Sequence, residues 1–240
     1  MGNRLWEYRT TPTAESELQA AFCMVDGVFH FIQCNSEGGL ALHIIEESSS
    51  LPEMDLKSAI EMEFKTPFAL LPKVFHETGI PGYTGITGNV SLDENTVLCS
   101  GISGTQAQVH VALPLYRHAK SIAEKSKNLV YCYAQNAYCF VFVFKNEICE
   151  LANIYPAVNE SEVMYFCMAG AKKSGLDVRQ IDFVLLGNNT KTITAAFERF
   201  GIAIQPAPIE LPYKLGEYPP YPAESFLLYQ YLTCALPVEN

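Results

Sequence analysis

Apolar and polar positions alternate in short runs near the start of the chain, and these runs predict strands. They span residues 18–25, 28–34 and 40–46. Asp26-Gly27 separates the first two runs, and both residue types tolerate the positive φ angles of a two-residue hairpin turn. Gly38-Gly39 separates the second run from the third. We therefore expect a three-stranded antiparallel meander, preceded by a loose polar arm over residues 1–17.

The rest of the first half carries a mixed pattern. Residues 50–53 read Ser-Leu-Pro-Glu, a capping box that begins a helix, and Leu56, Ile60 and Phe64 follow at helical spacing. Glycine recurs through residues 79–106, which we expect to form an irregular loop region. The remaining apolar runs predict strands at 68–71, 97–99 and 109–111, a brief helix at 73–75 and a longer helix at 115–126.

The same order of elements starts again near residue 128. Asn159 and Glu162 form a second capping box, and Gly175 follows the helix that they begin. Strands are expected at 129–134, 138–144, 147–154, 183–186 and 202–205, and later helices at 190–200 and 224–235. We infer two copies of a β-β-β-α-β-α-β unit. They correspond to an N-terminal lobe, residues 1–127, and a C-terminal lobe, residues 128–240, which ends in a Pro- and Tyr-rich tail and the final helix.

This element order resembles the ribonuclease-H-like unit, and two such units in tandem are similar to the actin-like ATPase superfamily. Residues 68–75 (Phe-Ala-Leu-Leu-Pro-Lys-Val-Phe) and 184–187 (Val-Leu-Leu-Gly) are similar to segments of an uncharacterised bacterial family, a domain of unknown function, assigned to this fold. The resemblance covers residues 18–210. It implies an α/β protein with two lobes, each with a mixed sheet of three antiparallel strands plus parallel strands, flanked by helices.

The resemblance also implies where a nucleotide would bind. Catalytic members hold the ATP phosphates with an Asp-x-Gly hairpin turn in each half, and they place two glycines in the loop beneath the adenosine. Here the first turn is Asp26-Gly27, the second contains neither glycine nor acid, and the adenosine loop keeps one glycine in Gly187-Asn188. We therefore expect a vestigial nucleotide cleft at Asp26, Gly27, Gly187 and Asn188, with no catalytic residue and no metal site. Mg-ATP is the cofactor that these positions would take if any is bound.

Composition narrows the classes of function. The chain has 240 residues, 49% of them apolar, and its 26 acidic and 16 basic residues leave a net charge of −10. That charge repels nucleic acid and anionic membrane surfaces. The strand interiors also lack the carboxylates with which nucleases of this fold bind metals. No secretory signal or membrane-spanning stretch is expected, and the eight cysteines show no Cys-x-x-Cys spacing, so we expect free thiols and a cytoplasmic location.

Other residue clusters have both a structural and a functional interpretation. His43 and Glu46 alternate to opposite faces of a strand, so we expect a solvated edge rather than a metal site. Cys132 and Cys139 are expected to be core residues, with a thiol pair or soft-metal site as the alternative. The C-terminal tyrosines, from Tyr213 to Tyr231, are expected to pack over the second half, with a protein interface as the alternative.

These observations predict a non-enzymatic binding or scaffold protein. Its partner would be another protein, held by the lobe cleft, by the loop region 79–106 or by the C-terminal aromatic segment. The alternative is an ATP-binding or ATP-hydrolysing protein with atypical phosphate loops. The sequence leaves the partner and the oligomeric state open.

Overall fold

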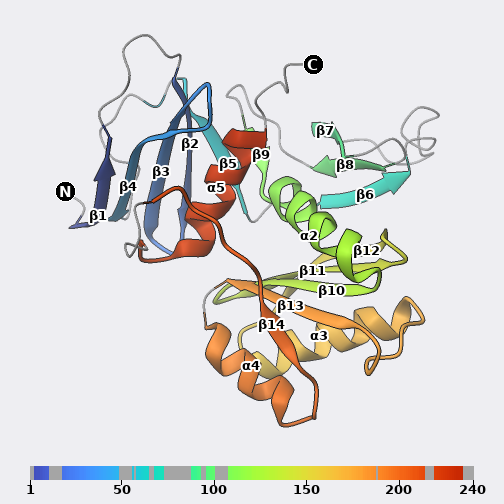
Figure 1. Ribbon diagram of the computed structural model, residues 1–240. Coiled ribbons are helices and arrows are strands. Elements are labelled where there is room, and N and C mark those ends of the chain that lie inside the picture. The colour runs from blue at the N-terminus through green and yellow to red at the C-terminus, as the bar shows by residue number, and fades with distance from the viewer. Residues whose placement is uncertain are drawn as a thin grey trace. The chain divides into compact units, whose positions relative to one another are not determined.

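In the computed structural model, the chain forms two compact units (Figure 1). Residues 1–65, 102–114 and 209–240 make the first unit, and residues 66–101 and 115–208 make the second. The described residues are 3–10, 18–48, 56, 58–64, 68–72, 88–92, 96–100, 108–187, 189–213 and 219–234. The predicted capping box at 50–53, the brief helix at 73–75 and most of the region 79–106 lie outside them. The lobe boundary at residues 127 and 128 stays a prediction.

A six-stranded mixed sheet forms the centre of the first unit. Its strands are β1 (Asn3–Arg9), β2 (Leu18–Val25), β3 (Val28–Asn35), β4 (Leu40–Glu47), β5 (Ile60–Glu63) and β9 (Gln108–His110). Strands β2, β3 and β4 form the predicted antiparallel meander, and β5 and β9 extend it in parallel beyond β2. Asp26 and Gly27 turn the chain between β2 and β3 with φ angles of 50° and 78°, as expected for this hairpin.

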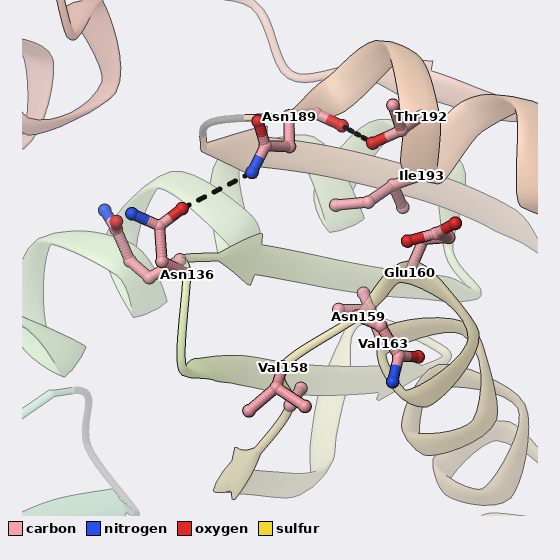
Figure 2. Close-up of a pocket in the computed structure, with 10 residues that line it drawn as sticks. Asn136, Val158, Asn159, Glu160, Val163, Asn189, Thr192 and Ile193 are labelled. Atoms are coloured by element: carbon pink, nitrogen blue, oxygen red, sulfur yellow. Dashed lines mark hydrogen bonds between the residues drawn. The ribbon is translucent and has the colours of Figure 1, made fainter.

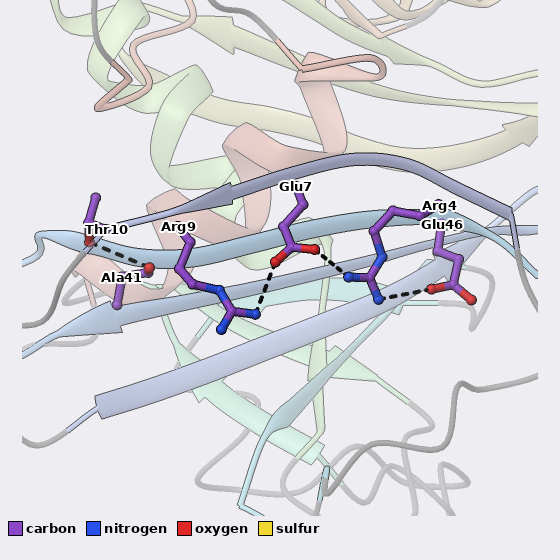
Figure 3. A network of polar contacts seen from close by, with 6 residues as sticks. All are labelled: Arg4, Glu7, Arg9, Thr10, Ala41 and Glu46. Atoms are coloured by element: carbon purple, nitrogen blue, oxygen red, sulfur yellow. Dashed lines mark hydrogen bonds and ion pairs between the residues drawn. The ribbon is translucent and has the colours of Figure 1, made fainter.

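The polar segment at the start of the chain is an edge strand. The loose arm predicted for residues 1–17 is wrong for residues 3–9, which form β1 antiparallel to β4. Arg4 and Arg9 both form ion pairs with Glu7, and Arg4 Nη2 also lies 3.5 Å from Glu46 Oε2 of β4 (Figure 3). Charged side chains suit an edge because water still reaches them and they discourage pairing with another chain.

Strand β5 replaces the end of a predicted helix. Leu56, Ile60 and Phe64 have helical spacing, but Ile60–Glu63 pairs in parallel with β2 and β9, so the helical prediction is wrong there. Met62 and Phe64 are buried between partly exposed glutamates. The order Ile-Glu-Met-Glu-Phe also has a period of two, and this is the period that the protein follows.

The C-terminal helix α5 (Pro222–Cys234) packs on β3 and β2 of the first sheet. The expectation that the C-terminal segment covers the second half of the chain is therefore wrong. Leu227 and Leu228 are fully buried, and Tyr229 Oη donates a hydrogen bond of 3.1 Å to the Gly38 carbonyl. The described part of the tyrosine-rich segment thus packs on the first unit, with its tyrosines half-buried or exposed.

His43 joins β4 to this C-terminal segment. It is fully buried, so the predicted solvated edge is wrong. Its Nδ1 forms a hydrogen bond with Tyr213 Oη, and its Nε2 lies 3.2 Å from Ser225 Oγ. Trp6 packs edge-on against the rings of His43 and Tyr213, with centroids 4.8 and 5.2 Å away. Burial lowers the pKa of His43 to about 3 and that of His30 on β3 also to about 3, so both rings are neutral at pH 7.

A five-stranded mixed sheet forms the centre of the second unit, and it confirms the repeat. Its strands are β10 (Leu129–Ala134), β11 (Tyr138–Lys145), β12 (Ile148–Pro156), β13 (Asp182–Gly187) and β14 (Ile204–Pro206), with helices α3 (Glu160–Lys173) and α4 (Thr190–Glu198). The spatial order β12-β11-β10-β13-β14 repeats the order β4-β3-β2-β5-β9 of the first unit. In each sheet three antiparallel strands are followed by two parallel ones, as predicted.

The face of this sheet toward α3 and α4 carries small apolar residues and thiols. Cys132, Cys139 and Cys167 are buried there among valine and alanine side chains, as expected of core cysteines. Hydrogen bonds from Cys139 and Cys167 and burial raise the pKa of Cys132, which keeps its thiol uncharged. Within the described part of the chain, no three His, Cys, Asp or Glu side chains are grouped so as to hold a metal ion.

The opposite face is aromatic. Its side chains belong to Tyr131, Tyr133, Phe140, Phe142 and Phe144. Helix α2 (Ala112–Ser126) places Tyr116 against Phe142 and Phe144, with ring centroids 6.5 and 5.9 Å away. His118 Nδ1 lies 2.9 Å from Tyr131 Oη, and burial lowers the pKa of His118 to about 4. The second unit thus has one compact and one bulky core layer.

A separate antiparallel sheet also belongs to the second unit. It contains β6 (Phe68–Pro72), β7 (Gly88–Ser91) and β8 (Thr96–Ser100) in the order β6-β8-β7. The strand expected at 68–71 is present, but it does not join the first sheet, where β5 takes its place. Phe68 instead stacks on Phe140 and Phe142. Gly88–Ser91 forms a strand that pairs with β8, so the irregular loop expected over residues 79–106 is wrong there. Among the described helices, none has the length and apolar character needed to cross a membrane.

Candidate functional site

A pocket of about 140 Å³ lies at the carboxyl end of β10 in the second unit (Figure 2). Strand β10 has β11 and β12 on one side and β13 and β14 on the other, so the strand order reverses at β10. Ligands of α/β sheets bind at such switch points. Three segments line the pocket: the β10–β11 turn, the start of α3 and the start of α4. Its lining residues are Gln135, Asn136, Ala157, Val158, Asn159, Glu160, Val163, Asn189, Thr192 and Ile193.

The β10–β11 turn is short and closed by its own backbone. The Gln135 N–H donates to the Tyr138 carbonyl at 2.9 Å, and the buried Gln135 side chain donates to Tyr133 Oη. Asn136 is exposed. The turn therefore contributes the amide side chain of Asn136 to the pocket rim, in place of the glycine and acid of a phosphate-binding turn.

Helix α3 begins at the second wall of the pocket. Asn159 Oδ1 accepts a hydrogen bond of 3.0 Å from the Glu162 N–H, and Glu162 Oε2 accepts one of 2.7 Å from the Val158 N–H. This is the predicted capping box. The cap occupies amide N–H groups that an uncapped helix could offer to an anion.

Asn189 forms the third wall and closes the pocket toward the turn. Its backbone is left-handed, with φ of 54°, and its side chain does not cap α4. Asn189 Nδ2 instead donates to Asn136 Oδ1 at 3.4 Å, as the dashed line in Figure 2 shows. The sequence carries no signal for this partner, which is more than fifty residues away.

The pocket has little positive charge. Glu160 is the one ionisable residue among its described lining residues, and neither lysine nor arginine lines it. Pockets for drug-sized ligands occupy about 300–1,000 Å³, so this pocket of about 140 Å³ suits a group much smaller than a nucleotide.

Gly187 lies at the end of β13, where it pairs with Ala134 of β10. Its φ is +121°, and a Cβ added here would lie 2.1 Å from the Ala134 carbonyl oxygen. The close approach of two backbones therefore requires glycine at this position, independently of any ligand.

Asp26 and Gly27 occupy the β2–β3 turn of the first unit. The Gly27 carbonyl accepts a hydrogen bond of 2.9 Å from the Ser48 N–H, so the turn is tied to the residue that follows β4. Asn188 lies outside the described residues. The assignment of Asp26, Gly27, Gly187 and Asn188 to a vestigial nucleotide cleft stays a prediction.

The two asparagines at the helix starts should respond differently to substitution. Asn159→Ala removes the side-chain cap of α3 and should lower the free energy of unfolding by about 1 kcal/mol. Asn189→Gly removes no cap bond and relieves a left-handed backbone, so it should cost less. Urea denaturation of both variants measures the difference, and equal losses would contradict the capping geometry.

Comparison with known proteins supports the fold and leaves the activity open. Residues 103–198, less than half of the chain, match the model of a family described as a protein of unknown function (DUF3822). No curated protein matches the sequence.

Solved structures share the architecture. A protein with actin-like ATPase fold and unknown function from Bacteroides thetaiotaomicron has a TM-score of 0.61 and 12% identity, with 80% of this chain and 91% of that chain covered. An activator of 2-hydroxyisocaproyl-CoA dehydratase from Clostridium difficile, with bound ADPNP, has a TM-score of 0.44 and 8% identity over 91% and 95% of the two chains. A structure of the PilM-PilN type IV pilus biogenesis complex also has a TM-score of 0.44 and 8% identity, over 78% and 87%. The expected resemblance to an uncharacterised family and to the actin-like ATPase fold is confirmed, and the chain has that fold.

Proposed function

We propose that this protein has a non-catalytic, protein-binding or scaffold role, on an actin-like ATPase fold whose nucleotide site is degenerate. The hydrogen bond between Asn136 and Asn189 carries the proposal. It joins the turn that would hold phosphate to the loop that would hold adenosine, across the pocket that a nucleotide would need to enter. The site residues Asp26, Gly27, Gly187 and Asn188 would then be remnants.

Electrostatics supports the same conclusion. A triphosphate needs cations or a cluster of free N–H groups. The pocket instead presents Glu160 and amide side chains, and the Asn159 cap already uses one N–H group of α3, that of Glu162. The starts of α3 and α4 supply partial positive charge, but this is weak compared with a lysine or a magnesium ion. The described cysteines form no disulfide and are mostly buried, which is consistent with the cytoplasmic location that we also propose.

Thermal denaturation with Mg-ATP separates this role from ATP binding. A ligand present at about 100 times its Kd stabilises the native state by about 2.7 kcal/mol. That corresponds to a rise in Tm of roughly 5–10 °C for a chain of this size. We expect no shift at millimolar Mg-ATP. A rise in Tm that Asp26→Ala abolishes would overturn the proposal and establish the alternative, an ATP-binding protein with atypical loops.

Affinity purification from native cytosol tests the protein-binding role itself. We expect the same partner to be retained with and without ATP, because the proposed role does not use nucleotide. Retention that depends on ATP, or the absence of any partner at stoichiometric level, would contradict it.

A further inference from the structure

In the part of the chain that the structure describes, the two mixed sheets have four edge strands, and three of them are protected against pairing with another chain. Strand β1 carries the ion pairs of Arg4, Glu7 and Arg9 (Figure 3). Strands β9 and β14 are three residues long, and β14 ends in Pro206, which has no N–H. Short length, charge and proline are the usual means of blocking an edge.

Strand β12 is the exception. It spans nine residues, Ile148–Pro156, and among the described strands it pairs with β11 alone (Figure 1). Glu150 is its single charged residue, and its proline stands at the last position. Strand β6 contacts β12 without pairing with it. A bulge falls between Leu151 and Cys149, so the regular part of this edge begins at Leu151.

The ladder register shows which backbone groups face outward. The Ala157 N–H donates to the Ala137 carbonyl, and hydrogen-bonded and non-bonded pairs alternate along an antiparallel ladder. Residues 151, 153 and 155 therefore bond to β11, whereas Ala152 and Ile154 direct their N–H and C=O groups away from it. The Ile154 N–H accordingly bonds to the side-chain oxygen of Asn153, at 2.9 Å.

An aromatic surface flanks this edge on the α3 side. Tyr155 of β12 stacks on Phe166 of α3 with ring centroids 4.3 Å apart, and Tyr165 lies beside Phe166 with 64% of its surface exposed. A strand added beyond β12 would place alternate side chains next to these rings.

Charge distinguishes a second copy of this chain from another protein as the binding partner of the β12 edge. The chain carries −10, and Glu147 and Glu150 are exposed at the start of β12. A second copy would bring the same negative charge to the same edge, whereas a strand with a basic residue would complement it. We propose that β12 binds an extended segment of another protein, with apolar residues at alternate positions and a lysine or arginine beside Glu150. This inference rests on the proposed protein-binding role and specifies its surface.

A random linear peptide library of strand length, displayed on phage, is the probe. Selection against the immobilised full chain should yield peptides of the stated pattern. The affinity of the selected peptide, measured by fluorescence anisotropy, should fall by about tenfold or more in Ala152→Pro, which removes an outward N–H that the sheet itself does not use. Ala152→Val keeps that N–H and should bind like the wild type.

Glu150→Lys provides a second variant if Ala152→Pro lowers the Tm, because Glu150 is exposed and its replacement disturbs no core. It should also weaken binding of the basic peptide by about tenfold. Equal affinity for wild type, Ala152→Pro and Glu150→Lys, or no enriched peptide, would overturn the inference. So would self-association of the wild type that Ala152→Pro abolishes, since the occupant would then be a second copy. If wild type and Ala152→Pro retain the same partner in the affinity purification, β12 is not the binding surface, but the proposed protein-binding role still holds.

Discussion

Mild acid should destabilise this protein strongly, with the loss of stability beginning near pH 6.5 and continuing to about pH 3. Three buried histidines cause it: His30, His43 and His118. Burial lowers their pKa values to about 3, about 3 and about 4. In the unfolded chain they regain a pKa near 6.5. Between these values the unfolded state binds more protons than the folded state, so stability is complete above pH 6.5 and falls as the pH is lowered.

The size of this pH dependence follows from the number of protons that the chain takes up on unfolding. One proton taken up on unfolding changes the free energy of unfolding by about 1.4 kcal/mol per pH unit, so three change it by about 4 kcal/mol per unit below pH 6. A domain is stable by about 5–15 kcal/mol in total. Urea titrations at several pH values measure this slope. A free energy of unfolding that stays constant from pH 7 to pH 5 would contradict the neutral, buried state of these rings.

Two probes assign the effect to the two units. Trp6 is the single tryptophan and contacts His43, so its fluorescence follows the first unit. His118→Gln removes one titrating group from the second unit while retaining a hydrogen-bonding group for Tyr131. This variant should reduce the slope by about one third, as expected for one of three protons.

The five-stranded sheet of the second unit and its helices α3 and α4 could be predicted almost completely because their signals are local. Asn159 and Glu162 mark the start of α3 within four residues, and Gly175 ends it with a φ of +67°. Strands β10 and β11 are uninterrupted apolar runs separated by a polar turn. Each of these features depends on neighbours in sequence, which a single chain displays.

The errors in the first unit arise from competing or distant determinants. Residues 60–64 fit a helical and a strand period together, and pairing with β2 decides between them. The burial of His43 depends on Tyr213, which is 170 residues away, and on Ser225, which is 182 residues away. No local pattern contains that information. The bond between Asn136 and Asn189 was missed for the same reason, because its two residues are 53 positions apart.

Gly187→Ala should destabilise the second unit severely, by more than about 4 kcal/mol. The added Cβ would lie 2.1 Å from the Ala134 carbonyl oxygen and 3.0 Å from two further backbone atoms of Ala134, so β13 and β10 would have to separate. Gly201→Ala is the matched control. Gly201 also has a positive φ, +70°, but no atom lies within 4 Å of an added Cβ. It should therefore cost only the left-handed backbone preference, about 1–2 kcal/mol.

Urea denaturation of these two variants also tests why residue 187 has to be a glycine. A glycine kept for nucleotide contact would lose only its backbone preference on replacement by alanine, about 1–2 kcal/mol, and would lose stabilisation by Mg-ATP as well. A glycine required by the close approach of β10 and β13 should give a different result. Its replacement should cause a large loss of stability, and Mg-ATP should stabilise neither the wild type nor the variant. Equal, small losses in Gly187→Ala and Gly201→Ala would show that β10 and β13 do not approach as closely as the ladder between Ala134 and Gly187 requires. The same measurement therefore separates a structural requirement of the sheet from a remnant of phosphate binding.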